Sequence, residues 1–186
     1  MIQKVLPFLL AFVLNFSVEA ATKAKVTMPD RVTVKKTSLV LNGLGIRKAT
    51  WLRVKVYVGG LYLKKKTKDA SAAINQAGPK YLRMHFVRDV AAKKLVAAWT
   101  EGFEAAVKDH KKISSEIKQF NNWMEDVQKG EEIVLTFLKD GVEVDVKNKQ
   151  KGKIKSKRFA KDLLSIWFVN PRDENLMLGM LGKSDD

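Results

Sequence analysis

The chain has 186 residues, of which 46% are hydrophobic and 30% charged, and it contains no cysteine. A chain of this length ordinarily forms one domain with one sizeable core, so we predict a single domain rather than two. The lack of cysteine excludes disulfides and thiolate metal sites. The formal net charge of +15 indicates attraction to anionic surfaces or ligands and carries no information about the fold.

Residues 1–20 have the features of a secretory signal peptide. Lys4 provides a short positive start, an apolar run follows, and the sequence Val18, Glu19, Ala20 fits the small-x-small pattern that signal peptidases recognise. A membrane-spanning helix needs about 20 apolar residues, and this run ends after about ten, so an uncleaved anchor is the weaker alternative. We expect cleavage after Ala20, a mature domain of residues 21–186 and a location in a bacterial periplasm.

The first half of the mature chain is expected to form strands. After a polar lead-in at residues 21–29, the alternation at residues 31–34 predicts a short strand. Residues 39–63 then read as a central strand pair, in which Gly43 and Gly45 provide turn chemistry because glycine reaches positive φ without steric cost.

The second strand of this pair shows a clear alternation from residue 52 onward. Its apolar residues predict a core face, whereas Arg53, Lys55 and Tyr57 fall on the opposite face, which is expected to meet solvent. Gly59 and Gly60 within the strand predict either a bulge or a close approach of another segment.

The remaining chain is expected to supply helices, one further strand and a hairpin. Asp69 is predicted to cap a short helix at residues 69–77, and Asp89 to cap the longest helix, whose apolar side chains recur at helical spacing. The other elements predicted from apolar periodicity are a strand at residues 81–87, a helix at 114–127, a hairpin at 133–146 turning at Asp140 and Gly141, and helices at 159–168 and 174–181.

A run of lysines follows the hairpin at every second position. These residues are Lys147, Lys149, Lys151, Lys153, Lys155 and Lys157. On a continuous strand they would form one cationic ridge, and a loop around Gly152 would scatter them. The favoured interpretation is an exposed edge strand that lysines protect from aggregation. The alternative is a contact surface for anionic lipid or another polyanion.

The search for familiar catalytic or cofactor motifs is largely negative. His85 and His110 have no spacing that resembles a metal site, and no phosphate-binding glycine loop or nucleophile elbow occurs. We therefore expect no cofactor and no metal. Nucleic-acid binding is also not expected, because the aromatic residues fall on apolar helix faces and do not interleave with the lysines.

Four segments carry a resemblance to a known family. They are GLGIRKATWLRVKVYVGGLYL, RMHFVRDVAAKKLVAAWTEGF, KGEEIVLTFLKDGVEVDV and FAKDLLSIWF. Their order is similar to that of the chalcone isomerase family, in particular its bacterial exported branch, over nearly all of the mature chain. The resemblance implies an α+β fold, an open-faced β-sandwich whose antiparallel sheet is covered by helices on one side, with a ligand cleft between the layers. It does not choose between plant flavonoid isomerases, plastid fatty-acid binders and members without known chemistry.

The resemblance implies a role for three residues. Arg47 matches an arginine that stabilises the substrate oxygen in plant isomerases and pairs with the carboxylate in fatty-acid binders. Tyr57 lies where the fatty-acid binders also have a tyrosine and the isomerases a threonine. Ser165 matches a substrate-contacting serine or threonine, although a helical serine can simply bond its own backbone. If the chain were an isomerase, Arg47 and Tyr57 would be the catalytic candidates; the alternative is that Arg47 only forms an ion pair and Tyr57 only closes the cleft.

Two positions depart from the pattern of the plant enzymes. Leu95 stands where they have a catalytic tyrosine, and Gly102 lies near the position of their asparagine. We therefore expect a non-catalytic binder of a small apolar ligand with an anionic head, most simply a fatty acid or related lipid. The alternatives are an isomerase of the intramolecular lyase type, acting on a phenolic or conjugated substrate, and a cationic module that contacts the cell envelope.

Overall fold

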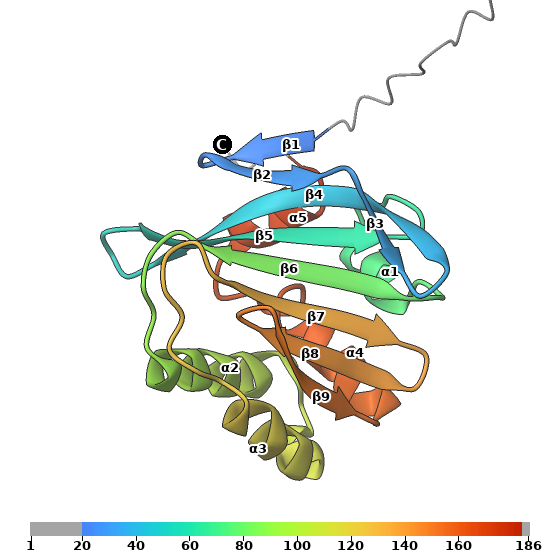
Figure 1. Cartoon of the computed structure of the whole chain (residues 1–186). Helices are drawn as coiled ribbons and strands as arrows, with labels where there is room; N and C mark the ends of the chain where they lie inside the picture. The colour runs from blue at the N-terminus through green and yellow to red at the C-terminus, as the bar shows by residue number, and fades with distance from the viewer. Residues whose placement is uncertain (1–19, 184–186) are drawn as a thin grey trace, which may run out of the picture.

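A seven-stranded antiparallel sheet organises the chain, as a computed structural model shows for residues 20–183 (Figure 1). The strands follow chain order across the sheet, so each strand pairs with the next strand along the chain. The signal-peptide prediction for residues 1–19 lies outside the described residues. The strands are β3 (Arg31–Val34), β4 (Thr37–Ala49), β5 (Val54–Leu63), β6 (Lys80–Phe86), β7 (Glu132–Leu138), β8 (Gly141–Val146) and β9 (Lys149–Ile154).

The helices pack together on one face of this sheet. A large core of buried side chains joins them to the inward-facing residues of β5 to β8, among them Phe86, Leu135 and Val144. Within the described residues, no helix is long and apolar enough to cross a membrane. The helices are α1 (Ala70–Asn75), α2 (Ala92–Ala106), the 3-10 turn η1 (His110–Ile113), α3 (Ser114–Asn122), α4 (Lys157–Ser165) and α5 (Glu174–Met180).

The opposite face of the sheet is covered in part by a hairpin that the sequence did not predict. The segment expected to be a polar lead-in forms β1 (Ala20–Lys23) and β2 (Val26–Pro29), which pair in an antiparallel manner. Ala24 and Lys25 form the turn at positive φ without a glycine or asparagine that would have indicated it. Met28 of this hairpin packs in a second, smaller core with Leu39 and Tyr62.

The glycines of the central pair serve close packing and not a turn, contrary to the expectation. Gly43 and Gly45 lie inside β4, and a Cβ atom on either would collide with backbone atoms of α5, those of Gly179 and Leu176. The missing side chains thus let α5 lie directly against the strand, and the actual turn falls at residues 50–53. This contact places the N-terminus of α5 beside the end of β4.

Replacing Gly45 by alanine should therefore lower the free energy of unfolding by about 1–3 kcal/mol or more, because a backbone contact cannot yield as a side chain can. Gly59 is the matched control, since it lies directly opposite Gly45 on β5. A Cβ there would meet only side-chain atoms, at 3.3–3.4 Å. Urea unfolding of both alanine variants measures the difference; equal losses would contradict the role assigned to the α5 contact.

The helix predictions were correct where the signal was local. Asp69 caps α1 as expected, its Oδ1 atom accepting a hydrogen bond from the backbone N–H of Ala72 at 2.6 Å. Asp89, in contrast, is not the N-cap of α2. The helix begins after Ala91, and its first backbone N–H, that of Ala92, donates to Asp126 from a distant segment at 2.7 Å. The third helix ends at Asn122, five residues before the predicted end.

The lysine run does not form one continuous ridge. Lys147 occupies a turn at positive φ between β8 and β9, and β9 is the edge strand that the favoured interpretation predicted. Several of these lysines also have acidic partners. Lys153 lies 2.7 Å from Asp140, and Lys151 forms an ion pair with Glu125. A membrane contact through this surface remains a prediction.

Candidate ligand-binding cleft

A cleft of about 460 Å³ opens between the ends of β4 and β5, the face of α2 and the chain that joins α4 to α5. This volume lies in the range of roughly 300–1,000 Å³ that is typical of small-molecule sites. Its buried lining is apolar except for the hydroxyl of Tyr57 and the indole nitrogens of two tryptophans. The buried residues of the lining are Tyr57, Phe86, Leu95, Trp99, Gly102, Ile166, Trp167 and Leu176.

A β-bulge explains why Tyr57 points into this cleft and not to solvent. In the register of the pair, Arg47 lies opposite Tyr57 and Lys48 opposite Lys55, so Val56 is an extra residue on β5. Both Val56 and Tyr57 consequently line the cleft. The predicted solvent face is thus wrong at Tyr57, because strict alternation fails at the bulge, and only 8% of its surface is exposed.

Arg47 is held at the cleft by the N-terminus of α5. One nitrogen of its guanidinium, Nη1, lies 3.3 Å from Oδ2 of Asp173 and also donates to the backbone carbonyl of Lys48. The same Oδ2 accepts the backbone N–H of Lys48 at 2.6 Å, while Oδ1 caps α5 by accepting from Leu176. Among residues 20–183, nothing bonds the Nη2 and Nε groups of Arg47, which leaves donors for a ligand.

Tyr57 is anchored from the other side of the cleft. Its hydroxyl oxygen accepts a hydrogen bond from Nε1 of Trp167 at 3.0 Å, and its ring packs against Phe86. In the described part of the chain the O–H proton has no acceptor, so it is available to a ligand oxygen. Burial raises the pKa of Tyr57 to about 12, although the Trp167 bond and the charge of Arg47 act in the opposite direction. The phenol is therefore a neutral donor at physiological pH.

This burial predicts a loss of stability at alkaline pH. Tyr57 is protonated in both states below about pH 10; between about pH 10 and 12 only the unfolded chain releases the proton, so the free energy of unfolding falls as pH rises. Between about pH 9.5 and 11.5, the decrease in the free energy of unfolding, measured in urea, should be smaller in Tyr57→Phe than in the parent protein by about 1.5–2 kcal/mol. Burial also raises the pKa of Tyr62, so Tyr62→Phe should likewise show a smaller decrease and serves as a comparison. If the pH dependence of Tyr57→Phe equals that of the parent protein, the raised pKa of Tyr57 is contradicted.

The rim of the cleft carries more positive than negative charge. Arg88, Lys94 and Arg172 join Arg47 in the lining, against the two carboxylates of Asp89 and Asp173. Arg172 forms an ion pair with Glu101, and desolvation together with the nearby charge of Arg47 lowers the pKa of Arg172. Such a rim favours an anionic over a cationic head group.

The structure does not bring Ser165 into the cleft. Its hydroxyl donates to the backbone carbonyl of Lys161 at 2.9 Å, one turn earlier in α4, and it is absent from the lining. Ligand contact by Ser165 therefore has no geometric support. Its hydroxyl bonds within its own helix, which is the alternative that the sequence left open. Leu95 and Gly102, by contrast, both line the cleft.

Three functional candidates were missed by sequence reasoning. Asp173 and Trp167 reach Arg47 and Tyr57 from 126 and 110 residues away in the chain, and no local pattern announces such pairings. The Nε1 atom of Trp99 is buried without a partner among the described residues. No three His, Asp or Glu side chains in residues 20–183 are grouped so as to hold a metal ion.

Fold and site together define an open-faced β-sandwich of the α+β class with an apolar cleft on its helical side. Residues 20–182 match the family model described as chalcone isomerase-like, and the chain belongs to this family. A crystal structure of a fatty-acid binding protein from Arabidopsis thaliana is similar, with a TM-score of 0.69 and 17% sequence identity, over 88% of this chain and 96% of that one. The comparison with curated protein sequences gave no match.

Proposed function

We propose that this protein is a non-catalytic binder of a fatty acid or a closely related lipid, acting in the periplasm after export. The observation that carries the proposal is that two hydrogen-bond donors, Arg47 and Tyr57, lie opposite each other on β4 and β5 at the wall of a largely apolar cleft. The acyl chain would lie against the aromatic and aliphatic lining, and the carboxylate would accept hydrogen bonds from the free guanidinium donors and the phenol.

The lining also weighs against an isomerase. Leu95, matched to the catalytic tyrosine of the plant enzymes, and Gly102, near the position of their asparagine, both line the cleft and carry no side-chain hydroxyl or amide. Tyr57 is a poor base, because burial keeps its pKa near 12. Electrostatic stabilisation by Arg47 alone would remain for catalysis, which makes binding the better supported function.

Calorimetric titration of the delipidated protein with palmitate tests the proposal. The matched ligand is the sixteen-carbon alcohol, which has the same chain and no charge. We expect palmitate to bind at micromolar concentration or tighter and the alcohol to bind at least about tenfold more weakly, since a charged hydrogen bond contributes about 1.5–3 kcal/mol. Absence of palmitate binding would refute the proposal, and rapid cyclisation of a chalcone would favour the isomerase.

A further inference from the structure

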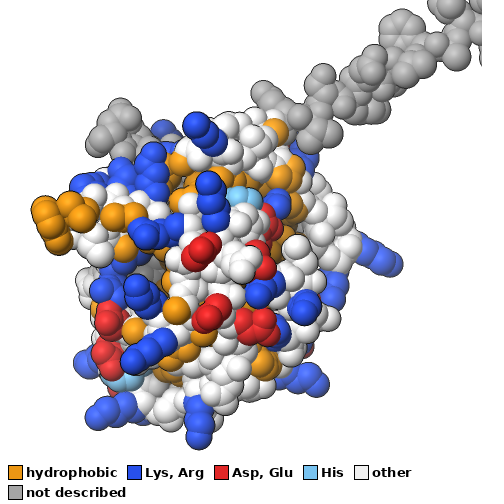
Figure 2. Space-filling model, turned by 60° about the vertical axis from the view of Figure 1, so that its left-hand side comes forward, with side chains coloured by type: hydrophobic (Ala, Val, Ile, Leu, Met, Phe, Trp, Pro, Cys, Tyr) orange, Lys and Arg blue, Asp and Glu red, His pale blue; other side chains and the backbone are white. Residues whose placement is uncertain are grey.

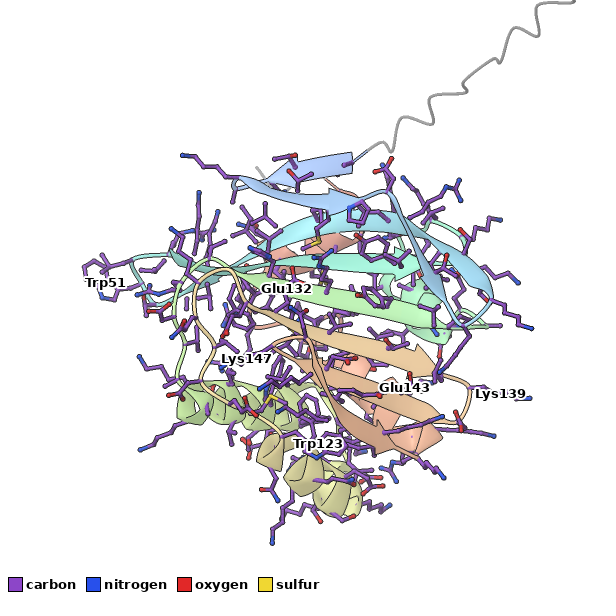
Figure 3. All side chains as sticks on the ribbon, viewed as in Figure 1. Trp51, Trp123, Glu132, Lys139, Glu143 and Lys147 are labelled. Atoms are coloured by element: carbon purple, nitrogen blue, oxygen red, sulfur yellow. The ribbon has the colours of Figure 1, made fainter. Side chains whose placement is uncertain are left out.

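The turn between β4 and β5, residues 50–53, presents two large apolar side chains to solvent. Trp51 is 88% exposed and Leu52 is 63% exposed, which is far more than any other large hydrophobic residue described. Figure 3 shows Trp51 at the tip of the hairpin, pointing away from the body of the protein. Exposure of two adjacent large apolar side chains to water is unfavourable in free energy and is typical of a contact surface.

The backbone of this turn is constrained as well as exposed. Thr50 and Arg53 both have positive φ, 63° and 51°, and the N–H of Arg53 donates to the carbonyl of Thr50 at 3.0 Å. A β-branched residue at positive φ is a steric outlier that persists only where the surroundings enforce it. This turn leaves Trp51 and Leu52 exposed at its tip.

The surroundings of the tip are cationic. Lys48, Arg53 and Lys55 flank it, and no acidic residue occurs in the sequence between Asp30 and Asp69. Arg88, on the rim of the cleft, is also exposed. Figure 2 shows hydrophobic side chains protruding at one edge of the molecule with Lys and Arg side chains beside them. Apolar tip and basic flanks together match an anionic lipid surface.

The same turn also forms part of the rim of the cleft. Thr50 and Leu52 belong to the cleft lining, and Arg47 lies three residues before Thr50, near the end of β4. Whatever surface meets Trp51 therefore lies at the entrance through which a ligand passes. Two apolar side chains are too few for the roughly 800 Å² that each partner contributes to a typical stable protein interface, whereas an interfacial tryptophan beside basic residues suits a bilayer.

We propose that residues 50–53 dock on an anionic lipid bilayer, so that the entrance of the cleft faces the bilayer. Trp51 and Leu52 insert at the headgroup level, and Arg53 and Lys55 contact the lipid phosphates. The proposal rests on the proposed function in one respect, that the ligand exchanged there is an acyl lipid. The docking itself does not depend on the identity of the ligand.

Co-sedimentation of the purified protein with vesicles tests the docking. Vesicles of phosphatidylglycerol and phosphatidylcholine should bind the protein, and pure phosphatidylcholine vesicles should bind it at least about tenfold more weakly. Trp51→Ala should weaken binding by at least about tenfold, and Arg53→Glu with Lys55→Glu should abolish it at low salt. Lys149→Glu with Lys155→Glu is the matched charge change, at the start of β9 and just after its end, and should retain binding.

Fluorescence quenching by brominated lipid locates the inserted group. Quenching in the parent protein should be strong, and it should disappear in Trp51→Phe, which keeps an apolar tip and therefore keeps sedimenting with vesicles. Three results would each overturn the proposal. Trp51→Ala could bind vesicles as well as the parent protein does, or only the variant of Lys149 and Lys155 could lose binding. The third is that the tip cross-links to a protein and the parent does not bind vesicles.

Palmitate titration without vesicles separates this proposal from the proposed function. Trp51 does not line the cleft, so Trp51→Ala should keep the palmitate affinity of the parent protein. If the parent binds vesicles through Trp51 and fails to bind palmitate, the docking surface stands and the fatty-acid function falls. If it binds palmitate and ignores vesicles, the docking proposal falls alone.

Discussion

Replacing Asp173 by asparagine should tighten palmitate binding several-fold, whereas replacing Arg47 by methionine should weaken it by roughly 10- to 100-fold. The two variants alter opposite ends of one ion pair. Arg47 contributes charge-assisted hydrogen bonds to the carboxylate, and methionine keeps an apolar stem without any donor. Asp173 competes with the ligand for the same guanidinium, so removal of its charge should release Arg47 to the ligand.

Asparagine is the appropriate change because Asp173 has a second task. It caps α5 through Oδ1 and accepts the backbone N–H of Lys48 through Oδ2. Asparagine is also a favourable N-cap residue, and its single acceptor oxygen can keep the cap while the bond from Lys48 is lost. Alanine would remove the cap and confuse a loss of helix stability with an effect on binding. Urea unfolding of both variants should therefore accompany the titrations.

Lys94→Met provides the control for general electrostatic attraction. Lys94 is an exposed cation on the same rim, and its loss should change the palmitate affinity less than about threefold, because exposed charges are screened. Unchanged affinity in Arg47→Met, combined with a lower free energy of unfolding, would show that the pair with Asp173 is purely structural. That outcome is the alternative that the sequence left open.

The fold was predictable where neighbours in sequence determine the structure. The strand at Arg31–Val34, the Asp69 cap and the hairpin of β7 and β8 were all recognised from local patterns. The turn of that hairpin lies one residue earlier than predicted, at Lys139 and Asp140, and Gly141 already begins β8. The predictions that failed concern residues whose roles depend on partners far away in the sequence. The cap of α2 comes from Asp126, and Gly45 is needed because α5 packs on it, so neither role could be seen in the surrounding residues.

The candidate site was predictable only in part, and for a similar reason. Arg47 and Tyr57 were singled out through the family resemblance, and the sheet register places them side by side. Periodicity alone would have assigned Tyr57 to solvent, because it cannot detect the bulge at Val56. The groups that hold the two side chains, Asp173 and Trp167, come from the last quarter of the chain and carry no recognisable motif of their own.

Replacing Val56 by phenylalanine should weaken palmitate binding by roughly 50- to 200-fold. Val56 is the extra residue of the bulge and lines the cleft, so the larger side chain should extend into the space that the acyl chain occupies. A phenyl ring displaces roughly three or four methylene groups, and each buried methylene contributes about 0.8 kcal/mol, or about fourfold in affinity. Titration with saturated fatty acids of increasing length measures the effect.

The dependence on chain length distinguishes filling of the cleft from damage to the fold. Octanoate should lose less than about threefold in Val56→Phe, because a short chain leaves room for the ring, and affinity should stop rising at a shorter chain than in the parent protein. Val32→Phe is the matched control: Val32 is half-buried in the second core on the opposite face of the sheet, so its palmitate affinity should be that of the parent. Equal losses for octanoate and palmitate would mean that the bulge itself had moved, and an unchanged palmitate affinity would place the acyl chain outside this cleft.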